Sequence, residues 1–393
     1  PTSGGRDAGE PSPPAPLPEG EGRRFWGDAV RVLIAPQEFK GSLSADEAAA
    51  AIRAGIRKAR PGWQLDVLPM SDGGPGFIDA LRRAVKADTA AAIVQDALGR
   101  RVLARYITLH GTRTTVIEAA LANGLMHIAP EERDALHADS FGVGQVIADA
   151  LLAEPERLII GVGGSATTDG GAGMARALGA RFFDEAGRDL PPGGAALQRL
   201  ARIDWSPPAA LAGVEVVVAS DVTNPLVGPE GAATVYGPQK GATPEQVEVL
   251  EAALLRYAAV VRRSLGVEIA NLPGGGAAGG LAAGLVAFLG ARIVSGFDVV
   301  AEAAGLAERF AVADIVITGE GSYDAQSTQG KTTGRIRALA SAAGKECVLF
   351  AGRSSDEEVI SLSRLEPDAA QSMARAAKLL EAVARQWAES QPS

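Results

Sequence analysis

Five loops of this 393-residue chain combine glycine with the side chains that chemistry on phosphate groups would need. Each loop follows a short apolar run typical of a buried strand. Glycine lets the backbone approach phosphate oxygens, and consecutive N–H groups at the start of a helix attract anions. Carboxylates could hold Mg²⁺, and a lysine could offset the charge of a transferring phosphoryl group. The candidate residues are Lys40, Ser42, Asp72, Gly73, Gly163, Gly164, Ser165, Asp169, Asp221, Asn224, Glu320, Asp324 and Lys331.

This pattern favours phosphoryl transfer, although no loop matches a standard nucleotide-binding fingerprint. The third loop, GVGGSATTDGG, is neither a Walker A motif nor GxGxxG. Each candidate also has a structural interpretation. Lys40 could be a surface lysine, Asp72 and Asp169 could cap helices, and Asp221 with Asn224 could form a turn. The spacing alone therefore indicates an anion-binding α/β protein.

The elements that must position these loops begin with alternating strands and helices. A strand is predicted at 31–36, and Ser44 with Glu47 forms a capping box for a helix that ends at Arg60. A second strand at 64–70 leads through a glycine-rich loop into a second helix. This order indicates a parallel sheet, whose ligand-binding loops lie at the carboxyl ends of its strands.

Later segments indicate a second α/β unit. Short alternating segments over 90–118 predict antiparallel strands, which suggests a domain boundary near residue 90. Thr243 and Pro244 open a long predicted helix that extends to 265. Further strands are predicted at 157–162, 214–220, 314–319 and 346–352, and a last helix at 368–389. The predicted domains are a disordered tail at 1–27, a parallel-sheet domain at 28–89 and 285–393, and an inserted domain at 90–284.

Composition narrows the classes of function. The net charge of −9 disfavours nucleic acid as a partner, and the single cysteine excludes a disulfide framework. Three scattered histidines disfavour a histidine-rich metal site. No apolar run approaches the roughly 20 residues that span a membrane. We therefore expect a cytoplasmic protein without a membrane partner, and the sequence leaves a homodimer open.

Eight segments of the chain resemble the bacterial glycerate kinase family, in the class that includes enzymes of glyoxylate and glucarate metabolism. They occur in family order over roughly residues 30–352, and the most distinctive are FKGSLS, GGSATTDGGAGM and GPQKGAT. The other five contain LPMSDGGPG, IEAALANGL, DSFGVGQVIADAL, PGGGAAGGLAAG and DIVITGEGS, and SDVTNPL lies in the same segment as GPQKGAT. The resemblance implies two Rossmann-like α/β domains, one inserted in the other, with the active site in the cleft between them.

The resemblance also implies ATP-dependent phosphorylation of D-glycerate to 2-phosphoglycerate, with Mg²⁺ as cofactor. Its motifs carry over residue by residue onto the thirteen candidates above. We assign Lys40 to the substrate carboxylate or the transferring phosphoryl group. Asp72 or Asp221 would orient the attacking hydroxyl or hold Mg²⁺, and Asp221 is the first choice for the metal.

Two positions depart from the family's usual motifs. Pro75 stands where the second loop usually has Glu, and Ser322 stands where the late loop usually has Arg. These departures leave two alternatives, a kinase for another small hydroxy acid and an inactive paralogue that binds a metabolite.

Overall fold

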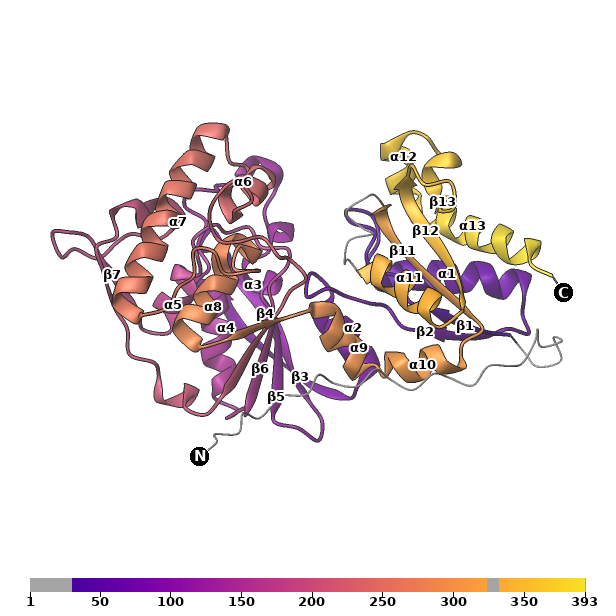
Figure 1. Cartoon of the computed structure of the whole chain (residues 1–393), viewed down its shortest axis with the longest axis horizontal. Coiled ribbons are helices and arrows are strands. Elements are labelled where there is room, and N and C mark those ends of the chain that lie inside the picture. The colour runs from indigo at the N-terminus through magenta and orange to yellow at the C-terminus, as the bar shows by residue number, and fades with distance from the viewer. Residues whose placement is uncertain (1–29, 324–331, 393) are drawn as a thin grey trace, which may run out of the picture.

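The computed structural model describes residues 30–323 and 332–392, and its fold is α/β (Figure 1). The predicted tail, Asp324 and Lys331 lie outside the described residues. The strands are β1 (Arg31–Ile34), β2 (Gln64–Val67), β3 (Ala87–Gln95), β4 (Arg101–Leu109), β5 (Thr114–Glu118), β6 (Arg157–Gly161), β7 (Arg181–Phe183), β8 (Arg202–Asp204), β9 (Glu215–Ala219), β10 (Arg292–Val294), β11 (Ile315–Tyr323), β12 (Glu346–Ser354) and β13 (Ile360–Ser361).

The α-helices alternate with these strands over much of the chain. They are α1 (Ala45–Ala59), α2 (Phe77–Ala84), α3 (Ala120–Asn123), α4 (Phe141–Leu151), α5 (Ala172–Ala177), α6 (Ala232–Tyr236), α7 (Pro244–Leu265), α8 (Leu281–Leu289), α9 (Gly296–Ala303), α10 (Leu306–Val312), α11 (Thr332–Ala342), α12 (Ala369–Ala374) and α13 (Ala376–Ser390). No helix among the described residues is long and apolar enough to cross a membrane.

Two sheets organise the fold. The first has the order β13-β12-β11-β1-β2, and all its neighbouring strands run parallel. The second has the order β10-β9-β6-β5-β4-β3, in which β3, β4 and β5 pair antiparallel and the rest run parallel. The antiparallel strands predicted over 90–118 are thus confirmed. A separate antiparallel pair joins β7 to β8.

Local signals explain where the two best-predicted helices begin. The Ser44 side chain accepts a hydrogen bond from the Glu47 N–H, while the Glu47 carboxylate accepts one from the Ser44 N–H. Thr243 forms the corresponding box with Gln246, and Pro244 occupies the first position of α7. The prediction of a helix over 244–265 is confirmed to the residue, because the capping box opens it and Gly266 closes it at φ 73°.

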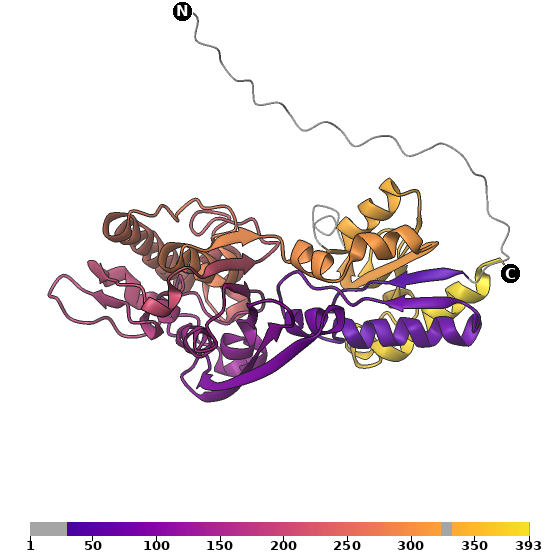
Figure 2. The ribbon, with the colours of Figure 1, turned by 90° about the horizontal axis from the view of Figure 1, so that it is seen from below.

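The single helix predicted at 368–389 is wrong, because the chain forms two helices there. The break is Arg375, whose backbone adopts φ −111° and ψ 9°, outside the helical range. Its guanidinium donates to the Glu366 carboxylate at 3.1 Å. Beyond the break, α13 lies along α1, and Gly55 permits the close approach because a Cβ there would lie 2.2 Å from the Glu381 carbonyl oxygen (Figure 2).

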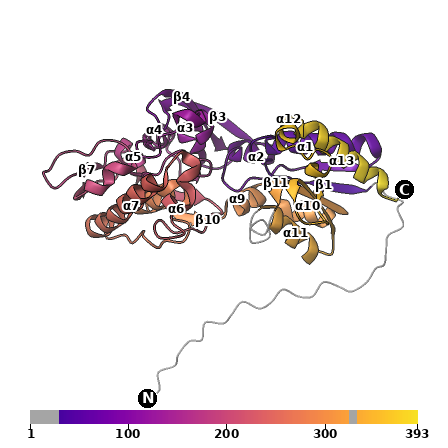
Figure 3. The ribbon, with the colours of Figure 1, turned by 90° about the horizontal axis from the view of Figure 1, so that it is seen from above.

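Helices cover both faces of each sheet. On the first sheet, α1 and α13 pack on one face, while α10 and α11 pack on the other (Figure 3). On the second sheet, α4, α5 and α8 cover one face. Helices α2 and α9 lie between the two sheets (Figure 1). Their side chains belong to one buried cluster that includes Leu33 and Val316 of the first sheet and Ile159 and Val217 of the second. The two sheets therefore share part of their core.

Candidate active site

The loop that follows β2 reaches across to the strand ends of the second sheet. Gly73 adopts φ +91°, and a Cβ there would lie 2.2 Å from the Ala219 carbonyl oxygen at the end of β9. The Gly163 N–H, just after β6, donates to the Gly73 carbonyl oxygen at 3.0 Å. Only glycine fits such a backbone at such close range. Three of the predicted loops, those containing Asp72, Gly163 and Asp221, are thereby brought together.

Asp72 and Asp221 form a pair of half-buried carboxylates at this junction. Burial raises the pKa of Asp221, and the neighbouring charge of Asp72 raises it further, whereas hydrogen bonds from Ser295 and the Phe297 N–H lower it. The Asp72 carboxylate accepts a hydrogen bond from the Gly74 N–H at 3.2 Å, which shapes the loop as an Asx-turn. The structural and functional interpretations of Asp72 are thus compatible.

Glu38 joins this acidic group, although sequence reasoning missed it. Burial raises the pKa of the Glu38 carboxyl to about 7, with a further contribution from Asp72, while Lys40 opposes the shift. Glu38 lies two residues before Lys40 in the same loop after β1. Its position just after a predicted strand could have marked it as a candidate site residue. A carboxyl with a pKa near neutrality in a cleft is a candidate proton acceptor.

Two cations adjoin the carboxylates. Lys40 is exposed and lies beside Glu38. Arg335, on α11, donates to the Ser295 Oγ at 2.6 Å, and its guanidinium lies 4.2 Å from the centre of the Phe297 ring. Because Ser295 in turn donates to Asp221, Arg335 is linked to the aspartate through one hydroxyl. Arg335 is the second residue that sequence reasoning missed, and its helical position gave no signal.

Hydrogen bonds to a buried carboxylate hold the glycine-rich loop after β6 in place. Asp169 has no exposed surface, and its Oδ2 accepts hydrogen bonds from the Ser140 N–H at 2.9 Å, the Ser140 hydroxyl at 2.7 Å and the Gly173 N–H at 3.0 Å. Its Oδ1 accepts from the Gly171 N–H at 3.1 Å. Burial raises the pKa of Asp169. In this arrangement the buried carboxylate of Asp169 shapes the turn into α5.

Lys240 supports the same loop and was also not among the predicted site residues. It is 2% exposed, and its ammonium donates to the Thr167 carbonyl oxygen at 2.5 Å and to the Ser165 Oγ at 3.4 Å. Burial lowers the pKa of Lys240 to about 7, and Asp169 opposes the shift. Its place in the GPQKGAT segment of the family resemblance was the signal that could have found it.

The remaining predicted residues are placed as follows. The Asn224 amide donates to the Glu230 carbonyl oxygen and accepts from the Tyr236 hydroxyl, each at 2.8 Å, so its side chain is engaged within its own turn. The Ser42 hydroxyl donates to the Phe39 carbonyl oxygen at 2.9 Å. Glu320 is 7% exposed in β11.

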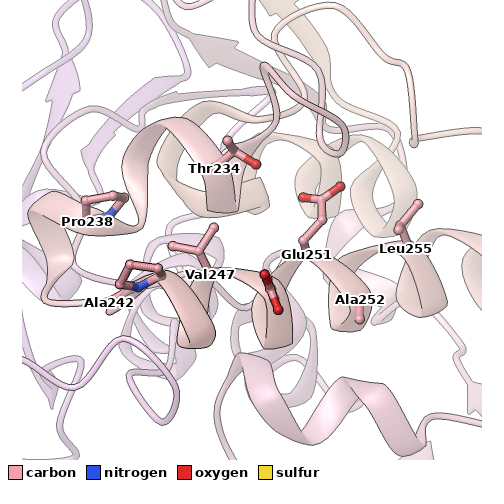
Figure 4. Close-up of a pocket in the computed structure, with 9 residues that line it drawn as sticks. Thr234, Pro238, Ala242, Val247, Glu251, Ala252 and Leu255 are labelled. Carbon is pink, nitrogen blue, oxygen red and sulfur yellow. The ribbon is translucent and has the colours of Figure 1, made fainter.

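Three cavities bear on where ligands could bind. One of 390 Å³ includes Glu38, Ser42 and Pro75 in its lining and lies between the first and second loops. A second of 560 Å³ includes Lys40 and lies against α12. The largest, of 690 Å³, lies between α6 and α7, and Figure 4 shows several of its lining residues, including Val247 and Leu255. That third cavity contains none of the predicted site residues.

The carboxylates at the junction limit how a divalent cation could be held. Within the described parts of the chain, no group of three or more histidine, cysteine, aspartate or glutamate side chains could hold a metal ion. Asp72 and Asp221 remain as a pair of neighbouring carboxylates. Mg²⁺ often takes only one or two carboxylates and completes its shell with water and substrate phosphate. The pair therefore fits Mg²⁺ bound together with a nucleotide.

Comparisons with known proteins cover nearly the whole described chain. Glycerate kinase from Halalkalibacterium halodurans is 43% identical over 322 residues, which are 82% of this chain and 85% of that protein. Glycerate 2-kinase from Escherichia coli K12 is 41% identical over 84% of this chain and 86% of that protein. The crystal structure of a candidate glycerate kinase 2 from Salmonella typhimurium LT2 matches with a TM-score of 0.74 at 41% identity, over 92% of this chain and 98% of that one. The model of the glycerate kinase family matches residues 32–391, and the chain belongs to that family.

Proposed function

We propose that this protein transfers the γ-phosphoryl group of ATP to a hydroxyl of D-glycerate, giving 2-phosphoglycerate and ADP. The observation that carries the proposal is the meeting of Asp72, Asp221 and the Gly163 loop at facing strand ends, with Lys40 beside the neighbouring Glu38, in a member of the glycerate kinase family. Carboxylates, a cation and a glycine-rich loop that meet at one point suit phosphoryl transfer. In that reaction, positioning of the reactants and stabilisation of charge dominate catalysis.

The acidic residues divide into two roles. Glu38 or Asp72 would accept or orient the proton of the attacking hydroxyl, since both lie on the loops of the first sheet beside Lys40. Asp221 would hold the metal. Lys40 would contact the substrate carboxylate or the transferring phosphoryl group. Arg335 would position Asp221 through Ser295.

Mg²⁺ would be held by Asp221, with Asp72 as its neighbour, and when bound it neutralises phosphate charge and aligns the transfer. The closeness of two half-buried carboxylates supports this, because burial and then the charge of Asp72 raise the pKa of Asp221, and a bound cation would offset both effects. Gly163, Gly164 and Ser165 would contact phosphate groups, and Asp169 and Lys240 would hold the loop that carries them.

The other assignments remain predictions. We propose that the two sheets mark two domains with the boundaries given above, that Asp324 and Lys331 contact the nucleotide, and that Ser42, Gly73, Asn224 and Glu320 shape the site. We place the reaction in the cytoplasm, where ATP is supplied. A homodimer stays open.

A coupled assay of ADP release over a panel of small hydroxy acids tests the proposal. D-Glycerate should give the highest kcat/KM, with turnover dependent on Mg²⁺. A higher kcat/KM for another hydroxy acid would favour the alternative suggested by Pro75 and Ser322. No turnover with any acid, combined with measurable glycerate binding, would favour the inactive paralogue.

A further inference from the structure

The 560 Å³ cavity lies at the carboxyl ends of β11 and β12, against α12. Backbone and small residues form its floor, among them Gly321, Ser322 and Gly352. Lys40 and Ser42 form one side, where the loop after β1 passes. Its volume lies within the range of cavities that hold ligands the size of a nucleotide.

A guanidinium stands at the mouth of this cavity. Arg353 pairs with Ser322 in the parallel register of β12 and β11, and its Nε donates to the Ser322 Oγ at 3.1 Å. Arg353 is exposed, and Lys40 lines the same cavity. Two cations, one on the loop after β1 and one on strand β12, therefore line the same cavity, and such an arrangement suits a polyphosphate chain.

The negative charge in the lining is already compensated. Glu366 lines the cavity, but its carboxylate accepts a hydrogen bond from the Arg375 guanidinium at 3.1 Å. That contact leaves Lys40 and Arg353 as the cations available to a ligand.

The opposite side of the cavity is apolar. Leu362, Pro367, Ala369, Met373 and Ala376 line it. An apolar wall facing two cations suits a ligand with a flat apolar end and an anionic end. A nucleoside triphosphate has that form, whereas glycerate is too small and too polar to use the apolar wall.

We propose that this cavity binds the nucleotide, with the base against α12 and the phosphates on Arg353 and Lys40. The inference rests on the proposed kinase function and adds Arg353 as a phosphate-binding residue. Lys40 connects the cavity to the carboxylates, because it lines the cavity and also lies beside Glu38. The γ-phosphoryl group would thus point toward Asp72 and Asp221. The guanidinium of Arg353 stands one strand away from position 322, where the family motif usually carries arginine.

Two variants test the cavity by direct binding of ADP and of a non-hydrolysable ATP analogue, measured by calorimetry on the full chain. Arg353→Met should weaken nucleotide binding roughly tenfold to a hundredfold, which corresponds to the loss of one charge-assisted contact. Ala369→Trp should also weaken it at least tenfold, because the indole fills the apolar side. The KM for glycerate should change little in both.

Matched controls keep the two variants interpretable. Arg364→Met removes a nearby exposed arginine that donates to the Asp356 and Glu357 carbonyl oxygens, and Ala370→Trp adds an indole at the next exposed position. Both should bind nucleotide like the parent. Unchanged nucleotide affinity in either Arg353→Met or Ala369→Trp would overturn the inference. If the parent binds nucleotide but phosphorylates no hydroxy acid, the proposed function fails while the cavity assignment stands.

Discussion

At the scale of single residues, Asp72 and Asp221 are distinguished by what surrounds them. Asp221 is tied to the start of α9 through Ser295 and the Phe297 N–H, and Arg335 stands behind it. Asp72 belongs to a glycine-rich turn after β2. The rigidly held carboxylate suits a metal, and the carboxylate in the turn suits a reacting hydroxyl.

Titration of Mg²⁺ at fixed ATP should separate the two aspartates. Asp221→Asn should raise the Mg²⁺ concentration for half-maximal rate by about tenfold or more, because a ligand is weakened. Asp72→Asn should lower kcat roughly a hundredfold with little change in Mg²⁺ demand, as expected for a group acting on the hydroxyl proton. The reverse pattern would exchange the roles, and an unchanged Mg²⁺ curve in both variants would remove the metal from this pair.

Glu38 should give the reaction a pH dependence. Since its pKa is raised to about 7, the carboxyl is protonated below that pH and ionised above it. A group that accepts a proton works only when ionised, so kcat/KM should rise as pH increases from 6 to 8. Glu38→Gln should lower kcat/KM and abolish this rise. The exposed Glu357→Gln serves as the control and should keep the parental profile. If the rise persists in Glu38→Gln, another group titrates.

At the scale of elements, the loop after β2 is the part that joins the two sheets. Gly73 and Gly76 both adopt positive φ, +91° and +84°, so alanine is strained at each. A Cβ at Gly73 would lie 2.2 Å from the Ala219 carbonyl oxygen, whereas a Cβ at Gly76 would meet nothing within 4 Å. An alanine side chain would therefore be strained at both positions, but it would clash with a neighbouring strand only at Gly73.

Gly73→Ala should consequently reduce kcat/KM by roughly a hundredfold, because a displacement of the loop misplaces Asp72. Gly76→Ala should lose stability by about 1–2 kcal/mol from the backbone strain and keep most of its activity. Thermal unfolding and steady-state kinetics on both variants measure these outcomes. Equal losses of activity in the two variants would mean that backbone strain, and not the close contact with β9, causes the loss in Gly73→Ala.

Elements with local signals could be predicted from the sequence, and those without could not. The capping boxes at Ser44 and Thr243 set the starts of α1 and α7. The break at Arg375 has no glycine or proline to mark it, since it depends on an ion pair with Glu366 and on packing against α1. The spacing of apolar residues predicts which face of a helix is buried, and it carries no information about an ion pair of this kind.

The same limit applies to the candidate site. Strand-end loops with glycine and charge identified Lys40, Asp72 and Asp221, because loops of that kind gather at one edge of a sheet. The sequence could not tell that Asp169 faces inward, since its burial depends on Ser140, which is 29 residues away. Nor could it pair Arg353 with Ser322, because that neighbour relation exists only in the register of two strands.

At the scale of the whole molecule, the shared core should make the two sheets unfold together. The cluster around α2 and α9 takes side chains from both sheets, so unfolding one half exposes apolar surface of the other. Phe297, which is 2% exposed, lies in this cluster. Chemical denaturation should therefore show a single transition.

Tryptophans in the two halves allow this prediction to be checked. Trp63 and Trp387 pack together beside the first sheet with ring centres 6.0 Å apart, and Trp205 packs on Phe288 beside the second at 5.4 Å. Two reporter variants are needed, both with Trp26 replaced by Phe. The first keeps Trp205 as its only tryptophan, and the second keeps only Trp63 and Trp387. Their fluorescence midpoints in denaturant should coincide.

Phe297→Ala in both reporter backgrounds then tests the cause. Removing a large buried ring costs about 3–5 kcal/mol, and because the ring belongs to a cluster shared by both sheets, the two midpoints should fall together. The ring also stacks on Arg335, so activity should fall as well, but the midpoints are read without substrate. If only one midpoint falls, or if the parental midpoints already differ, each half is stabilised by its own core. The site between the strand ends would then depend on docking of two independently stable units.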